Sequence, residues 1–190
     1  MLPLKEAIAE KHSLAEKMTF NQRMFNGELS KEEYVAYLCQ QLGIFDEIEN
    51  HELPHPSLNR VNSVLADIKE LMEVGEGQGI QIELLDSTKQ YRNYLKSLTK
   101  EEQLPHVYLN YLAIMFGGQM MKKNVPGSGK MYEFDGDVRE IAGTIRAVQK
   151  DEWADEANKA LDYNINILDE LQRVSESASN EVEVDGGEGA

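Results

Sequence analysis

The stretch Val107-Tyr-Leu-Asn-Tyr-Leu-Ala-Ile-Met-Phe-Gly-Gly-Gln-Met-Met121 is the most apolar part of the 190-residue chain, and it carries two adjacent glycines. Its apolar residues would cover nearly all sides of a helix, as in a helix that lies in a core or lines a pocket. Each glycine inside a helix costs about 1 kcal/mol relative to alanine. Gly117 and Gly118 therefore indicate either close helix packing or a kink, or else a flat ligand lying against bare backbone.

Helical spacing continues on both sides of this stretch, because apolar residues recur every three or four positions and strict alternation is rare. We therefore predict an all-α fold. The expected helices cover residues 4–25, 30–53, 58–74, 80–98, 105–121 and 136–174, the last as one long helix or a bent pair. Ser30 and Glu33 have the spacing of a capping box, and Pro105 is expected near a helix start.

The chain is predicted to form one helical domain over residues 1–174, followed by a disordered acidic tail over residues 175–190. The tail contains serine, glycine and acidic residues, with only alanine and valine as apolar material. Such a segment buries too little apolar surface to offset the entropy lost on ordering.

Composition narrows the possible partners. The chain has 34 acidic and 19 basic side chains, a net charge of −15, which disfavours a nucleic-acid surface. No apolar run approaches the roughly 20 residues that span a bilayer, and no secretory leader is recognisable. A single cysteine, Cys39, cannot form an internal disulfide. We expect a monomeric cytoplasmic protein that binds neither nucleic acid nor membrane.

His12 is the strongest candidate metal ligand in the sequence. It shares a helical stripe with Leu4 and Ile8, which predicts that it points inward. A lone inward histidine is more often a hydrogen-bonded core residue than a ligand. Glu16, one turn later, could orient the imidazole as carboxylates do behind metal-bound histidines.

Two other histidines carry weaker signals. Glu52-Leu-Pro-His55 imitates the Glu-x-x-His pattern of di-iron bundles, but it contains a proline and has no second copy. His106, next to Pro105, is interpreted as a helix-start residue. Neither supports a separate metal site.

Several motifs, in this order along the chain, resemble the biliverdin-producing heme oxygenase family. The motifs are Leu4-Lys-Glu-Ala7, His12-Ser-Leu-Ala-Glu16, Pro105-His-Val-Tyr108, Tyr108-x-x-Tyr-Leu112, Gly117-Gly-Gln-x-x-Lys-Lys123 and Asn164-Ile-Asn-Ile-Leu-Asp-Glu-Leu-Gln172. The resemblance covers nearly everything from Leu4 to Arg173, and it implies the single-domain helical bundle of that family.

The resemblance also implies roles for individual residues. His12 would be the proximal iron ligand with Glu16 behind it, and Gly117 and Gly118 would lie over the distal face of heme. Phe116 would line the same pocket. The groups that the family places near the heme propionates fall on Lys5, Tyr108 and Arg146, which suits cations and a phenol facing carboxylates.

The reaction implied by the family converts heme to biliverdin, carbon monoxide and ferrous iron. Heme is both substrate and cofactor, dioxygen is the oxidant, and a ferredoxin or a reductase supplies the electrons. An acidic electron donor would require a local basic patch. The candidates for it are Lys122, Lys123, Lys130, Arg139, Arg146 and Lys150.

One position departs from the family pattern. The distal helix of the family reads Tyr-Leu-Gly-Asp-x-Ser-Gly-Gly-Gln, whereas this chain has Tyr111-Leu-Ala-Ile-Met-Phe-Gly-Gly-Gln119. Ile114 replaces the aspartate that anchors distal water, and isoleucine neither donates nor accepts a hydrogen bond. We hypothesise that Asn110, one turn earlier, orders water in its place.

Two alternatives to the enzyme remain open. Ile114 favours a protein that holds heme or another flat tetrapyrrole without opening the ring. A helical domain that acts only by interaction has no support beyond its acidic surface, and surface charge usually serves solvation.

Overall fold

The computed structural model describes residues 1–75 and 78–185, with side chains described up to residue 181, and its regular elements are all helical. The elements are α1 (Leu4–Ala7), α2 (Ala9–Lys17), α3 (Thr19–Phe25), α4 (Lys31–Ile48), η1 (Pro56–Leu58), α5 (Val61–Leu71), α6 (Asp86–Lys96), α7 (Lys100–Leu112), η2 (Ala113–Gly117), α8 (Gly118–Met121), η3 (Lys130–Tyr132), α9 (Val138–Val148), η4 (Asp151–Trp153) and α10 (Ala154–Asp185). The prediction of an all-α fold is confirmed.

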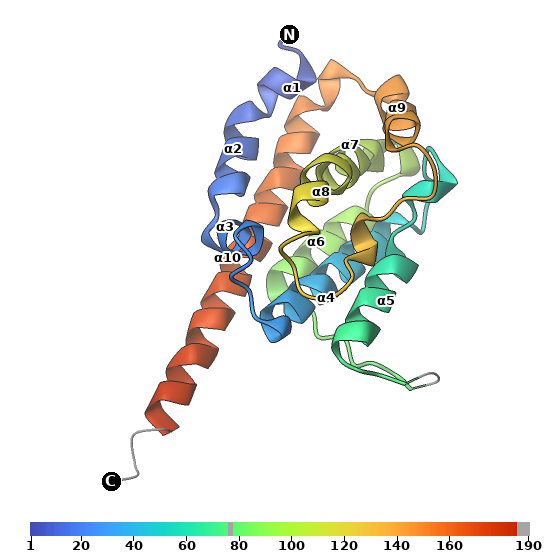
Figure 1. Cartoon of the computed structure of the whole chain (residues 1–190). Helices are drawn as coiled ribbons and strands as arrows, with labels where there is room; N and C mark the ends of the chain where they lie inside the picture. Colours follow the sequence, from blue (N-terminus) through green and yellow to red (C-terminus); the bar gives the residue numbers. More distant parts are fainter. Residues whose placement is uncertain (76–77, 186–190) are drawn as a thin grey trace.

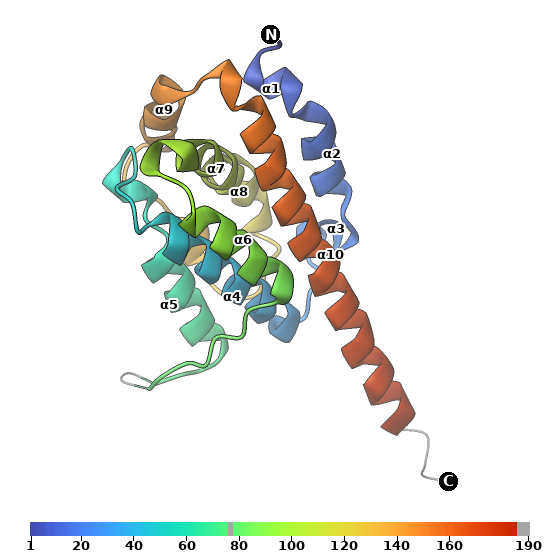
Figure 2. The same cartoon turned by 180° about the vertical axis from the view of Figure 1, so that it is seen from behind.

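The first half of α10 is the axis of the bundle (Figures 1 and 2). Helices α2 and α3 pack on it from one side, and α6 and α7 pack on it from the other. The second half of α10 projects beyond the body of the molecule in both views. Two segments far apart in sequence, α2 and α7, are therefore held by the same helix.

The predicted first helix, residues 4–25, is wrong as one element, because it is broken at Ile8 and at Met18. Met18 is extended, with φ −57° and ψ 135°. Two side-chain amides compensate the break: Asn21 donates to the Ala15 carbonyl at 3.5 Å, and Gln22 donates to the Glu16 carbonyl at 2.6 Å. Helix ends need such partners for their last carbonyls.

The starts of α4 and α7 are set by capping side chains and not by the position of a proline. The predicted capping box of Ser30 and Glu33 is present at the start of α4. A second box, formed by Thr99 and Glu102, starts α7 at Lys100, so Pro105 lies inside the helix and the prediction of a start there is wrong. A proline in the second turn removes a single intrahelical hydrogen bond near the helix end.

The last predicted helix is the bent pair, with α9 and α10 joined through η4. Helix α10 continues past Val174 to Asp185, into the segment for which the sequence predicts disorder. Adding residues to an existing helix avoids the cost of nucleation, which the composition argument omits. The rest of the predicted tail, residues 186–190, lies outside the described residues.

Two buried polar side chains hold the chain between α8 and α9 in place. They are Arg60, at the start of α5, and Asp67, within it. Asp67 accepts hydrogen bonds from the backbone N–H groups of Lys130 and Met131, both at 2.8 Å. Arg60, which is 4% exposed, donates to the carbonyls of Leu58 at 2.9 Å and Met131 at 3.2 Å. These bonds hold η3, and with it Tyr132, against the rest of the bundle.

No described helix combines the length and the apolar character that crossing a membrane requires.

Candidate functional site

The segment from η2 to α8 exposes an apolar stripe beside the buried Ile114, Met115 and Gly118. Ala113, Phe116, Gly117 and Met120 follow the i, i+3, i+4, i+7 spacing of one helical face, and all four are exposed. The exposed fractions of Phe116 and Met120 are 44% and 59%. A contiguous exposed apolar surface of this kind is typical of a binding site for an apolar ligand or partner.

The two adjacent glycines have different surroundings. A Cβ added at Gly117 would meet nothing within 4 Å, whereas a Cβ at Gly118 would lie 2.3 Å from Cδ1 of Tyr132. Gly118 is therefore explained by close packing, the plainer of the two interpretations. Gly117 presents bare backbone to open space, as the flat-ligand interpretation requires.

The backbone of the same segment is widened. Residues Ala113–Gly117 form a π-helical turn between α7 and α8. Such turns are uncommon and are found frequently at functional sites. The kink predicted from the glycines is therefore a π turn, and this turn contains three residues of the exposed stripe.

His12 and Glu16 lie together on α2. The His12 Nδ1 atom is 3.5 Å from Glu16 Oε1, and the side chains are 48% and 63% exposed. The prediction that His12 points inward with Leu4 and Ile8 is wrong, because the helix is interrupted at Ile8 and the stripe does not continue through α2. The contact with Glu16 on Nδ1 leaves Nε2 available to a ligand.

Of the three residues predicted near the heme propionates, Tyr108 of α7 and Arg146 of α9 lie near each other. The Arg146 guanidinium lies 5.0 Å from the centre of the Phe116 ring. Burial raises the pKa of Tyr108, and the nearby Arg146 charge opposes that rise. Lys5 is exposed on α1, and the N–H of its neighbour Leu4 donates to Asp151 of η4 at 2.8 Å.

Ile114 and Asn110 occupy buried positions beside the exposed stripe, with exposed fractions of 6% and 8%. Asn110 Nδ2 donates to the Tyr91 hydroxyl at 3.0 Å and to the His106 carbonyl at 2.9 Å. Its Oδ1 accepts from Asn164 Nδ2 at 3.1 Å. Both amide hydrogens are used, so Asn110 could hold a water only by accepting a hydrogen bond from it.

His106, interpreted from the sequence as a helix-start residue, is fully buried in a polar network. Its Nε2 lies 2.9 Å from Glu156 Oε1, and its Nδ1 lies 2.8 Å from the Tyr91 hydroxyl. Since a carboxylate only accepts, Nε2 carries the proton and Nδ1 accepts from Tyr91. Burial lowers the pKa of His106, and Glu156 only partly opposes this.

The network joins α6, α7 and α10 behind the exposed stripe. Sequence patterns did not predict Tyr91, Glu156 and Asn164, because their partners lie on other helices and leave no local signal. Glu156 is 50 residues from His106, and Tyr91 is 15 residues from it.

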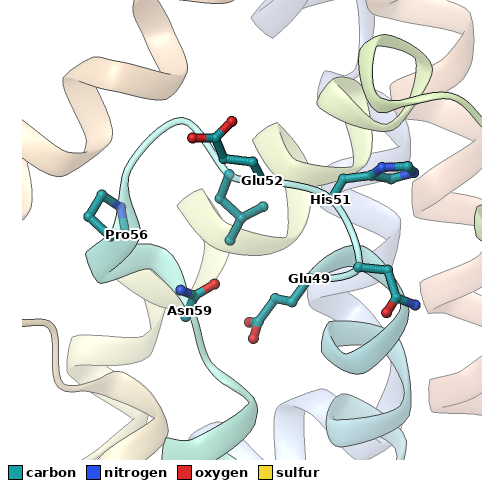
Figure 3. Close-up of a pocket in the computed structure, with 7 residues that line it drawn as sticks. Glu49, His51, Glu52, Pro56 and Asn59 are labelled. Atoms are coloured by element: carbon teal, nitrogen blue, oxygen red, sulfur yellow. The ribbon is translucent and has the colours of Figure 1, made fainter.

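A separate crevice lies at the connection between α4 and η1 (Figure 3). It is lined by Glu49, Asn50, His51, Glu52, Leu53, Pro56 and Asn59. The His51 ring and the Glu52 carboxylate point in different directions from the loop. Within residues 1–75 and 78–181, no three histidine, cysteine or carboxylate side chains converge on a metal position. His55 is not among the residues that line this crevice.

The chain matches the family model described as heme oxygenase over residues 2–170. This chain belongs to the heme oxygenase family. A heme oxygenase from Guillardia theta is 27% identical over 90% of this chain and 85% of its own length. Heme oxygenase 2 of Macaca fascicularis is 24% identical over 96% of this chain and 68% of its own length.

Solved heme oxygenases have the same fold. Heme oxygenase-1 from the cyanobacterium Synechocystis, in complex with heme, has a TM-score of 0.80 and 22% identity, covering 96% of both chains. Heme oxygenase-2 from Synechocystis, in complex with heme and NO, has a TM-score of 0.78 and 22% identity, covering 92% of this chain and 86% of its own. The fold predicted from the motifs, a heme oxygenase helical bundle, is confirmed.

Proposed function

We propose that this heme oxygenase family member binds heme between α2 and the η2–α8 segment, with His12 as the axial iron ligand. The observation that carries the proposal is the exposed apolar stripe around Gly117 on one element held by α10, together with the exposed imidazole on another. Heme is flat and largely apolar, carries iron at its centre and has two carboxylates at one edge. The stripe, the imidazole and a cationic end match these three features.

Three features of the described side chains support heme binding at this face. Gly117 leaves space where any other residue would place a Cβ. Phe116 and Met120 are already exposed on the same face. Lys5, Arg146 and the Tyr108 hydroxyl would bind the propionates and thereby set which meso edge of the ring faces the oxidant.

The reaction that we propose is the oxidation of heme to biliverdin, carbon monoxide and ferrous iron. When bound, heme supplies the iron that activates dioxygen and the ring that is oxidised. The protein's own contribution is orientation. His12 would ligate through Nε2, with Glu16 orienting the ring from Nδ1, while Gly117 and Phe116 would exclude bulk water from the opposite face.

A second candidate function is heme or tetrapyrrole binding without ring opening. Ile114 favours it, because the position offers no hydrogen bond to distal water. The bonding of Asn110 restricts its hypothesised role in ordering water to a single accepting lone pair. The retained His12, Glu16 and Gly117 favour the enzyme.

The electron donor that we propose is a ferredoxin or a reductase. It would meet a monomeric cytoplasmic protein near the basic residues that follow α8 and those on and after α9. Two of the predicted patch residues are paired with acids: Lys122 with Glu133 at 2.6 Å, and Lys130 with Glu70 at 3.5 Å. Lys123, Arg139, Arg146 and Lys150 form no ion pair among the described residues, so they are better candidates for the contact.

Heme titration of the wild type, His12→Ala and His51→Ala tests the proposal. We expect a Soret band with the spectrum of an imidazole-ligated heme in the wild type and in His51→Ala, and its loss or strong shift in His12→Ala. Identical spectra for wild type and His12→Ala would reject His12 as the ligand. Adding reduced ferredoxin or ascorbate under air then separates the two functions: free biliverdin indicates the enzyme, and unchanged heme indicates the binding protein.

A further inference from the structure

Gln41 is a buried side chain of α4 whose amide forms no hydrogen bond with the described residues. Its exposed fraction is 8%. Its amide oxygen and nitrogen both retain contact with solvent, because neither atom is fully enclosed. An amide in such a position, free on both atoms, is available to a ligand or a water.

The neighbouring Gln40 shows how a structural glutamine of this helix is bonded. It is 2% exposed. Its Nε2 donates to the carbonyls of Ala36 at 3.0 Å and Glu83 at 3.1 Å, and its Oε1 accepts from the N–H of Leu85 at 2.9 Å. Gln40 thus fixes the chain before α6, and Gln41 has no comparable structural role.

The solvent contact of Gln41 is on the inner side of α4. The side chains one turn away in either direction are Tyr37, Leu38, Ile44 and Phe45, and none is more than 9% exposed. Residues three and four positions apart share a helical face. The amide therefore reaches a space within the fold and not the outer surface of the helix.

Two contacts show what lies opposite Gln41. On one side, Phe45 packs edge-on against Tyr111 of α7, with ring centres 5.1 Å apart. On the other side, Tyr37 lies near Tyr132, whose pKa is raised by burial and by the hydroxyl of Tyr37. Tyr132 in turn fills the space beside Gly118.

Helix α4 therefore runs antiparallel to the segment from Tyr111 to Gly118. Gln41 lies one turn from each α4 contact, at Tyr37 and at Phe45. The residues opposite Gln41 are therefore those midway along the segment from Tyr111 to Gly118. This is the turn that contains Ile114 and Met115.

We propose that the Gln41 amide is the hydrogen-bonding group for a small ligand on the face of heme opposite His12. This inference rests on the proposed heme binding. Ile114 and Met115 offer no strong hydrogen-bonding group at this level, and Asn110 has no free N–H. Gln41 supplies two N–H donors and one acceptor. It would stabilise negative charge on a bound ligand, and it is a positioning residue because an amide does not deliver protons.

Paired substitutions in the full chain test this assignment. Gln41→Leu and Gln40→Leu remove an amide from adjacent positions of one helix, and the structure predicts opposite effects. In urea unfolding without heme, we expect Gln41→Leu to retain the wild-type midpoint and Gln40→Leu to lower it. In the ferric heme complex, we expect Gln41→Leu to weaken azide binding about tenfold, because a hydrogen bond to a charged ligand is lost. Gln40→Leu should change azide affinity by less than about twofold.

Azide affinity that is unchanged in Gln41→Leu would overturn the assignment, and so would a loss of stability equal to that of Gln40→Leu. Gln41→Met, which keeps the length of the side chain, gives the same test should the leucine variant fold poorly. Absence of a His12-dependent heme complex in the wild type would overturn both this inference and the proposed function. A normal heme complex with unchanged azide affinity would overturn this inference alone.

Discussion

Gly118 and Tyr132 fit together so closely that a Cβ on Gly118 would lie 2.3 Å from the tyrosine ring. Tyr132 is 2% exposed and cannot move aside without displacing its neighbours. The adjacent Gly117 has no such neighbour. The diglycine therefore combines one packing residue and one residue that leaves a surface open.

Alanine substitutions should separate these two roles. We expect Gly118→Ala to lower the free energy of unfolding by about 1–3 kcal/mol, as overpacking of a core does. Gly117→Ala should leave stability unchanged or raise it by up to about 1 kcal/mol, because alanine favours the helix. The same Gly117→Ala variant should weaken heme binding, since the Cβ occupies the open face. Chemical unfolding and heme titration measure both effects, and equal destabilisation by the two variants would contradict this division.

The buried His106 predicts a dependence of stability on pH. Its pKa lies below the ordinary value of 6.5 in the folded protein. As pH falls from 7 to 5, the unfolded chain therefore takes up a proton that the folded protein does not, and stability decreases. Glu156 adds to this only at more acidic pH. Burial alone would raise the pKa of Glu156, but hydrogen bonds from Tyr94, His106 and Lys159 lower it.

The test is urea unfolding at several pH values. His106→Gln removes the titration and should flatten the dependence between pH 7 and 5. His51→Gln, at a partly exposed position, should keep the wild-type slope. A slope that persists in His106→Gln would assign the effect to other groups.

Arg60 is a buried charge with a defined structural role, since it holds η3 in place together with Asp67. We expect Arg60→Met to destabilise the protein by about 3 kcal/mol or more, because the backbone carbonyls of Ser57, Leu58 and Met131 lose their donor and the half-buried Glu49 loses a nearby positive charge. Arg92→Met is the matched control. Arg92 pairs with Asp46 and Glu47 at a partly exposed site, and its loss should cost about 1 kcal/mol or less. Thermal and urea unfolding of both variants check the difference, and similar losses would refute it.

Charge reversal in the turn after α8 tests the proposed docking of an electron donor. Lys123 forms no ion pair among the described residues, so Lys123→Glu should strongly slow turnover driven by ferredoxin while leaving ascorbate-driven turnover intact. Lys96→Glu, on α6, should affect neither. Equal loss with both reductants would point to a damaged site instead of a lost docking contact.

The family, the fold class and several element boundaries follow from local sequence. These features depend on residues that are close in the chain, so a single sequence is enough to predict them. They are the helical spacing, the capping box of Ser30 and Glu33 and the adjacent glycines. The order of the motifs identified the family, and the family match over residues 2–170 confirms it.

The tertiary structure decided the roles of individual residues, because their partners lie far away in the chain. His106 is buried since α10 brings Glu156 to it across 50 residues, and Gly118 is a packing residue since η3 presents Tyr132 to it. The exposure of His12 depends on a break at Ile8 that periodicity does not reveal. The free amide of Gln41 is recognisable only from the hydrogen bonds and the solvent contact of the folded chain. Local sequence sets which helices form, whereas the packing of those helices sets which side chains remain free to bind.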